Sequence, residues 1–210
     1  MKKLLFFLGC MGTSIMGLAQ LQLNPQIGTT YQHLTPTDQN VTFKGAIGWQ
    51  FGVDARMGNR VFLQPGIFIG RNVTAMTTNL SDTIQYENDL VRTALKLKAL
   101  VGVRIVDSYQ FDLRFVAGPT YDVLLSTDVK GDDRISWNGG DFSKGSFNID
   151  AGLGFDMGLV TLEPSISFGL TRVMNDNITV RDIDSRYLTY GLTLGINFGD
   201  DDRRDHNAGR

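Results

Sequence analysis

Twelve charged residues of this 210-residue chain lie on one side of an alternating pattern, and they are its main candidates for chemistry. Six are basic and six are acidic: Arg56, Arg92, Lys96, Lys98, Arg104, Arg114, Asp54, Asp112, Asp122, Asp150, Asp156 and Glu163. Charged groups inside a protein can form a path for ions or protons, or they can pair with one another as salt bridges. The width of the space that encloses them decides between these two roles.

Residues typical of catalysis and of metal binding are scarce. The chain has two histidines, His33 and His206, and a single cysteine, Cys10. A serine–histidine–aspartate arrangement would have to use His33, and the pattern places no serine beside it. A zinc site would depend on carboxylates alone, and neither Asp132-Asp133 nor Asp182-x-Asp184 has the spacing of a calcium loop. We therefore expect no catalytic site, no metal and no cofactor.

Eight successive segments alternate apolar and polar residues with the period of two that β-strands show. In the second segment, Trp49 and Phe51 fall on one face, and Gln50 and Asp54 fall on the other. The segments are 21–31, 45–57, 61–71, 90–106, 110–125, 145–159, 160–174 and 186–198. Because only closure removes exposed strand edges, the pattern predicts an all-β fold, an eight-stranded antiparallel up-and-down transmembrane β-barrel.

The predicted connections alternate between long and short, as in outer-membrane barrels with short periplasmic turns and long outer loops. The long ones are 32–43, 72–89, 126–144 and 175–185, and the short ones are 57–60, 107–109 and 158–160. Tight turns would place Arg104 opposite Asp112, a favourable pair. They would also place Asp156 opposite Glu163, so a basic side chain from another strand would have to reach these two carboxylates.

The glycines indicate which face is inside. Most of the strand glycines share a face with the charged residues, and the interior of an eight-stranded barrel is only wide enough for side chains to fill it. The polar face is therefore predicted to be the lumen, where the charges form a salt-bridged plug, and the apolar face is predicted to meet lipid. Aromatic residues on the outward face lie mostly toward strand ends, as in an interfacial girdle: Tyr31, Trp49, Tyr121, Phe147, Tyr190 and Phe198.

The two ends of the chain differ from the barrel. Residues 1–19 combine two lysines, an apolar run and a small-x-small site ending at Ala19, which predicts a secretory signal peptide. The barrel is then expected over 20–198, and 199–210 form a charged tail that is expected to be disordered. Cys10 lies inside the signal peptide, and whether it is ever lipidated stays open.

Several short motifs carry a family resemblance. They are Leu63-Gln64-Pro65-Gly66, Gly118-Pro119-Thr120-Tyr121, and Leu162-Glu163-Pro164 with Gly169-Leu170-Thr171. Together they resemble the PorT-like outer-membrane β-barrel family over nearly the whole mature chain. The resemblance implies an outer-membrane barrel and a role in protein secretion. Phe198 resembles the terminal aromatic residue that the barrel-insertion machinery reads, although twelve residues follow it.

These observations predict a non-enzymatic, structural or partner-binding protein of the outer membrane. Its expected contacts are outer-membrane lipid, the insertion machinery and an envelope or secretion protein, and its balanced charge gives no reason to expect nucleic acid. Loops 72–89 and 126–144 are the predicted contact surfaces, and the second contains Trp137 and Phe142. The alternatives are a narrow channel for small solutes or ions, a membrane-embedded enzyme and a soluble periplasmic lipid-binding barrel.

Overall fold

The computed structural model describes residues 21–35, 41–81, 84–108, 111–131, 143–171 and 186–199, and these residues form nine β-strands. The strands are β1 (Leu21–Thr35), β2 (Val41–Gly58), β3 (Val61–Ser81), β4 (Ile84–Asp107), β5 (Asp112–Gly131), β6 (Gly145–Met157), β7 (Val160–Gly169), β8 (Arg186–Ile196) and β9 (Phe198–Gly199). None of the described segments is a helix long and apolar enough to cross a membrane.

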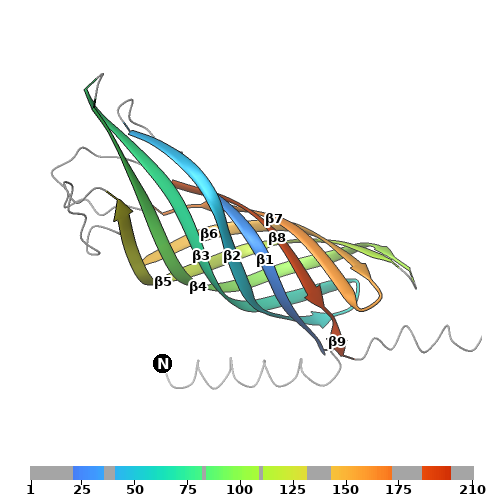
Figure 1. Cartoon of the computed structure of the whole chain (residues 1–210). Coiled ribbons are helices and arrows are strands. Elements are labelled where there is room, and N and C mark those ends of the chain that lie inside the picture. The colour runs from blue at the N-terminus through green and yellow to red at the C-terminus, as the bar shows by residue number, and fades with distance from the viewer. Residues whose placement is uncertain are drawn as a thin grey trace, which may run out of the picture.

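The strands close into a barrel (Figure 1). Each strand from β1 to β8 pairs antiparallel with the next, and β8 returns to β1 with Tyr31 opposite Tyr190. The short strand β9 continues this last pairing after Asn197, placing Phe198 opposite Leu23. The predicted eight-stranded antiparallel barrel is confirmed, with β9 as a two-residue extension of its closing strand.

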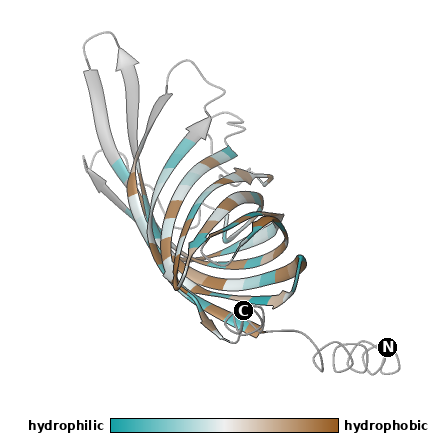
Figure 2. Ribbon diagram, turned by 90° about the vertical axis from the view of Figure 1, so that its right-hand side faces the viewer, coloured by the Kyte–Doolittle hydropathy of each residue, from teal (hydrophilic) through white to brown (hydrophobic). Residues whose placement is uncertain are grey.

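The faces of the barrel are oriented as the pattern predicted, with polar residues inside and apolar residues outside. In β6 every second residue is buried, and the buried positions include Asn148, Asp150 and Asp156. The residues between them are apolar, and Phe147 and Ile149 are exposed. Figure 2 shows this alternation as hydrophobic and hydrophilic bands along the strands. Closure of an alternating sheet therefore places the polar set in the lumen.

The predicted outer loops are too long. Residues 72–89 were expected to form a loop, but β3 continues to Ser81 and β4 begins at Ile84, so most of this segment is a paired hairpin. The same holds for parts of 32–43 and 126–144, because β1 ends at Thr35, β2 begins at Val41 and β5 ends at Gly131. Backbone pairing therefore continues past the ends of the alternating segments 61–71 and 90–106.

The short turns that join β2 to β3, β4 to β5 and β6 to β7 lie at one end of the barrel, together with Leu21 and Gly199. We call this the turn end and the opposite end the loop end. The turn after β6 needs only two residues, and Gly158 there has a φ of +61°, a conformation that glycine adopts without strain. The turn between β4 and β5 is longer than predicted. The Ser108 backbone N–H donates to the Asp112 carboxylate at 3.1 Å, and Asp107 lies opposite Asp112.

Candidate functional site

The lumen is the chemically rich part of the described molecule. Among the described residues, 23 polar or charged residues are buried and only six hydrophobic ones are. Of the twelve predicted lumen charges, those buried are Asp54, Arg56, Arg92, Arg104, Arg114, Asp150, Asp156 and Glu163. The other four, Lys96, Lys98, Asp112 and Asp122, are partly exposed. Buried charges require partners, so their contacts decide what the lumen can do.

One guanidinium is the centre of the largest network. Arg114, which is 1% exposed, contacts the Asp156 carboxylate through Nη1 and the Glu163 carboxylate through Nη2, each at 2.6 Å. Arg56 reaches Asp156 from the opposite wall at 3.0 Å. The side chain of Arg114 crosses directly over Gly154, where any Cβ would collide with the guanidinium. The glycine at this position leaves the room in which Arg114 makes its ion pairs.

Asp54 receives two hydrogen bonds from the adjacent strands β1 and β3 and one ion pair from β4. Gln26 and Gln64 donate to its Oδ2 atom at 3.0 and 2.9 Å, and the Lys98 ammonium lies 3.6 Å from the same oxygen. Together with the Arg114 network, these groups make a lower cluster at the turn end with three positive and three negative charges: Arg56, Lys98, Arg114, Asp54, Asp156 and Glu163. A balanced, mutually bonded set of this kind is a structural plug.

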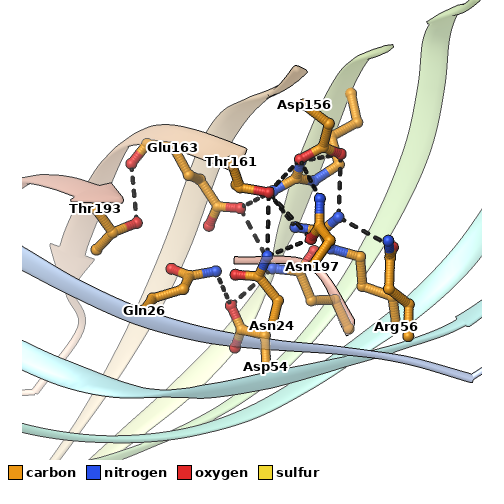
Figure 3. Close-up of polar contacts among 12 residues, drawn as sticks. Asn24, Gln26, Asp54, Arg56, Asp156, Thr161, Glu163, Thr193 and Asn197 are labelled. Atoms are coloured by element: carbon orange, nitrogen blue, oxygen red, sulfur yellow. Dashed lines mark hydrogen bonds and ion pairs between the residues drawn. The ribbon is translucent and has the colours of Figure 1, made fainter. Parts of the chain in front are cut away.

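Uncharged amides and hydroxyls complete the lower cluster (Figure 3). Asn24 donates to Thr161 Oγ1 at 3.0 Å and also to the side-chain oxygen of Asn197. Thr161 in turn donates to the Asp156 carboxylate. The predicted lumen network contained only charged residues. Asn24 and Thr161 occupy the same lumen-facing alternation, which was the signal for including them.

A second cluster lies nearer the loop end of the barrel. Lys96 contacts the Asp150 carboxylate at 3.3 Å, and the Thr120 hydroxyl donates to Asp150 at 3.0 Å. Asn148 donates to Asp122 at 3.1 Å. The guanidinium of Arg92 stacks on the ring of Tyr187, with Cζ 4.5 Å from the ring centroid. This upper cluster is also balanced, because it contains two basic and two acidic groups.

Apolar side chains also occupy the lumen, which the charge count did not predict. Phe62, Leu100 and Val116 form a buried cluster, and each is at most 3% exposed. The ring of Phe68 lies 3.8 Å from the Lys98 ammonium, and Arg104 lies 5.8 Å from the ring of Phe62. The phenylalanines interrupted the polar face in the sequence, and this interruption was the signal for an apolar layer.

Two predicted cross-strand pairs are wrong. Arg104 lies opposite Arg114, because a register shift between Arg104 and Val106 and the longer turn displace the strand. Asp156 lies opposite Thr161, because the turn consists of residues 158–159 and Met157 pairs with Val160. The expected basic side chain from another strand is present, since Arg114 contacts both Asp156 and Glu163.

Two cavities between the lumen side chains of the described barrel are small. One cavity of about 20 Å³ lies between the clusters, beside Lys96, Lys98 and Leu100. Another of about 30 Å³ lies beside Gln32, Asn72 and Lys96. A water molecule needs roughly 10–15 Å³ on this scale, so each cavity has room for about one or two waters. Neither of these two cavities has space for a solute much larger than water.

The described residues offer little for catalysis or metal binding. His33 is partly exposed on β1, where it lies opposite Leu188. No group of three or more histidine, cysteine, aspartate or glutamate residues that could hold a metal ion occurs within the described ranges. Other predicted features lie outside the described residues: the signal peptide with Cys10, the tail with His206, the acidic pairs at 132–133 and 182–184, and Trp137 and Phe142.

Comparisons with known proteins concern the fold. No protein-family model and no curated protein matches the chain. Solved structures with a similar shape include Ail, the attachment invasion locus protein of Yersinia pestis, in complex with the heparin analogue sucrose octasulfate (13% identity, covering 85% of this chain and 99% of that one, TM-score 0.47). Neisserial surface protein A is also similar, with 10% identity, coverage of 84% of this chain and 97% of that one, and a TM-score of 0.46. The outer membrane enzyme PagL has 10% identity, coverage of 83% of this chain and 98% of that one, and a TM-score of 0.41.

Proposed function

We propose that this chain is a non-enzymatic barrel of a Gram-negative outer membrane that binds a protein partner above the membrane surface. The supporting observation is the outer surface of the barrel. Thirty large hydrophobic side chains are exposed among the described residues, including Ile67, Leu97 and Leu153 in the middle of their strands. An apolar surface of this extent is incompatible with water and suits the hydrocarbon of a bilayer.

The edge of this apolar belt carries aromatic residues. Trp49 and Tyr190 are exposed on the outer face toward the loop end, and Trp49 stacks on Phe51 with ring centroids 5.7 Å apart. Tyr121 and Phe147 form a second outward pair, with centroids 4.6 Å apart. Amphipathic rings of this kind suit the boundary between hydrocarbon and headgroups. A soluble lipid carrier would instead need an apolar interior, and the described interior is mostly polar.

A sheet standing above the belt supports the partner-binding part of the proposal. The hairpin of β3 and β4 projects past the other strands, and it pairs with β2 and β5 on either side (Figure 1). β4 alone has 24 residues, or about 80 Å, whereas about 9–11 residues cross a bilayer. We infer that the excess length extends a four-stranded surface into the aqueous phase, where loops and projecting elements carry recognition.

The residue composition changes in this projecting sheet. Of the 14 residues 75–81 and 84–90, eight are polar or charged. Asp89 in this part of β4 is exposed. A segment of this composition suits water rather than hydrocarbon, and we assign the partner surface to this hairpin.

The PorT-like role in secretion is a narrower form of the same proposal. It rests on the resemblance of the motifs around Pro65, Pro119 and Pro164. These prolines lie in β3, β5 and β7, which all run from the turn end toward the loop end of the barrel. We propose that the partner is an envelope or secretion protein, and that Phe198, exposed at the end of the closing strand, serves as the insertion signal.

Membrane residence is tested by cell fractionation followed by gel electrophoresis with and without boiling. The protein is expected in the outer-membrane fraction after an alkaline wash, and the unboiled sample is expected to migrate differently from the boiled one because a closed barrel resists detergent. Release by the alkaline wash would contradict the proposal and support the soluble lipid carrier.

Shortening the projecting hairpin is expected to abolish partner capture without loss of the barrel. Thr74 lies opposite Leu90, so residues 75–89 can be replaced by an Asn-Gly turn that keeps the register of β3 and β4. The shortened protein is expected to retain its heat-dependent gel shift and to lose partners recovered by crosslinking in intact cells. Unchanged crosslinks with the shortened hairpin would place the partner surface elsewhere.

The channel alternative is tested by conductance in planar bilayers. The two charge clusters and the apolar layer between them leave cavities of only about 20 and 30 Å³, so we expect no stable conductance steps from the purified protein. Steps whose size changes in Lys96→Met would show that ions pass beside the upper cluster, and the non-conducting proposal would be wrong.

A further inference from the structure

Four prolines interrupt the barrel's backbone ladder in the same way. Pro25, Pro65, Pro119 and Pro164 lie in β1, β3, β5 and β7. At each proline, the proline and the residue before it have no partner on the preceding strand, which for β1 is the closing strand β8 with β9. The residues before and after these two positions are paired. For Pro65, the pairs Asp54↔Gly66 and Met57↔Leu63 are present, while the two positions between them are unpaired.

The other three gaps repeat this geometry. The β4–β5 ladder lacks the positions of Gly118 and Pro119, between the pairs Lys98↔Thr120 and Val101↔Ala117. In the β6–β7 ladder, Glu163 and Pro164 are the two unpaired positions. Where β1 pairs with β8 and β9, the two unpaired positions are Asn24 and Pro25. Proline has no N–H, so it cannot donate to the opposite carbonyl.

The gaps divide the barrel into four hairpins. On its other side each proline is paired without a gap: Pro25 with Val53, Pro65 with Ala99, Pro119 with Ile149 and Pro164 with Leu192. The pairs β1–β2, β3–β4, β5–β6 and β7–β8 are therefore continuous at this level. Each gap lies at a seam between two of these hairpins.

Lumen side chains cross every seam near its gap. Gln64 donates to Asp54 at 2.9 Å across β2–β3, and Arg114 joins Glu163 at 2.6 Å across the β6–β7 seam. Asn24 joins Asn197 across the seam that closes the barrel. At the β4–β5 seam, where the residue before proline is Gly118, the contact is apolar, between Leu100 and Val116.

We infer that lumen side chains hold the four hairpins together where the prolines leave the ladder incomplete, the lower cluster at three seams and the apolar contact of Leu100 with Val116 at the β4–β5 seam. Asn24, Gln64 and Glu163 each precede a proline, are at most 2% exposed and supply one of these contacts. The five residues centred on each proline follow one rule. The first and fifth residues are apolar or aromatic, and the second and fourth, on either side of the proline, are polar or glycine. The rule occurs once in each hairpin, and its lumen residues Asn24, Gln64 and Glu163 act as seam contacts.

Amide hydrogen exchange of the purified full chain in detergent micelles tests this role. Glu163→Gln removes the charge that holds Arg114 across the β6–β7 seam, and we expect exchange at Gly152–Phe155 and Leu162–Ser165 to rise by about tenfold or more. The matched control is Asp122→Asn, because Asp122 accepts from Asn148 inside the continuous β5–β6 hairpin. In the control, exchange around Asp122 is expected to change by less than about threefold.

A second variant separates a seam contact from general stability. Adding Pro164→Ala to Glu163→Gln returns an N–H opposite Leu153, and we expect slower exchange at the β6–β7 seam than in Glu163→Gln alone. Gln64→Leu provides the same comparison at the β2–β3 seam if Glu163→Gln does not fold. A rise in exchange spread evenly over all strands, or equal local effects in the seam variant and the control, would overturn the inference.

Discussion

Replacing Arg114 with methionine is expected to lower the free energy of unfolding by about 3–5 kcal/mol, the range for breaking a buried ion pair by removing one partner. Arg114 is 1% exposed and contacts two carboxylates at 2.6 Å. Without it, Asp156 keeps Arg56 at 3.0 Å, but Glu163 keeps no direct ion pair within the described residues, and the Gln64 amide donates to it at 3.4 Å. A carboxylate left without a direct ion pair in a buried site is the source of the cost.

The measurement is urea unfolding of the purified barrel in micelles, followed by the gel shift of the folded form. The control is the double variant Arg114→Met with Glu163→Met, which removes the stranded charge together with its former partner. We expect the double variant to recover most of the loss, because apolar pairs often replace buried ion pairs at little cost. A double variant as unstable as Arg114→Met alone would show that the charge of Glu163 is not the cause.

Replacing Leu97 with arginine is expected to cost about 2–4 kcal/mol and to reduce the yield of folded barrel in lipid vesicles. Leu97 is 41% exposed on the outward face of β4, near the middle of an outward row that runs from Thr93 to Ile105. If this face lies in hydrocarbon, a guanidinium there has no water to solvate it. Folding yield and unfolding free energy in vesicles measure the effect.

The control for Leu97→Arg uses the same strand above the belt. Asp89 is an exposed outward residue of β4, and arginine at this position is expected to change stability by about 1 kcal/mol or less, because the penalty falls to that level near the interface. Equal effects of the two variants would contradict the assignment of the apolar face to lipid. A large effect at Leu97 alone would locate the membrane on the barrel.

Much of the architecture follows from local pattern. A strand exposes successive residues to opposite faces, so the alternation of Trp49, Gln50 and Phe51 predicts both the strand and its two surfaces before any partner is known. Eight such segments and a glycine-rich polar face are enough to predict a closed barrel with Asp54, Arg56 and Arg114 in its lumen, where the structure places them. Where the strands end could not be read in this way, because β3 and β4 stay paired up to Ser81 and Ile84, beyond the alternating segments 61–71 and 90–106.

The partner of each lumen charge depended on the whole barrel. Register is set by the length of each turn and by bulges, and one residue more in a turn changes which side chains lie opposite, as it did for Arg104 and Asp112. Contacts across the lumen, such as Arg56 with Asp156, join residues 100 positions apart, and only closure brings them together. The sequence by itself determined the strands and which of their faces is polar. The tertiary structure decided the pairing of the charges and the seams at the prolines, because both arise from neighbours that local alternation does not specify.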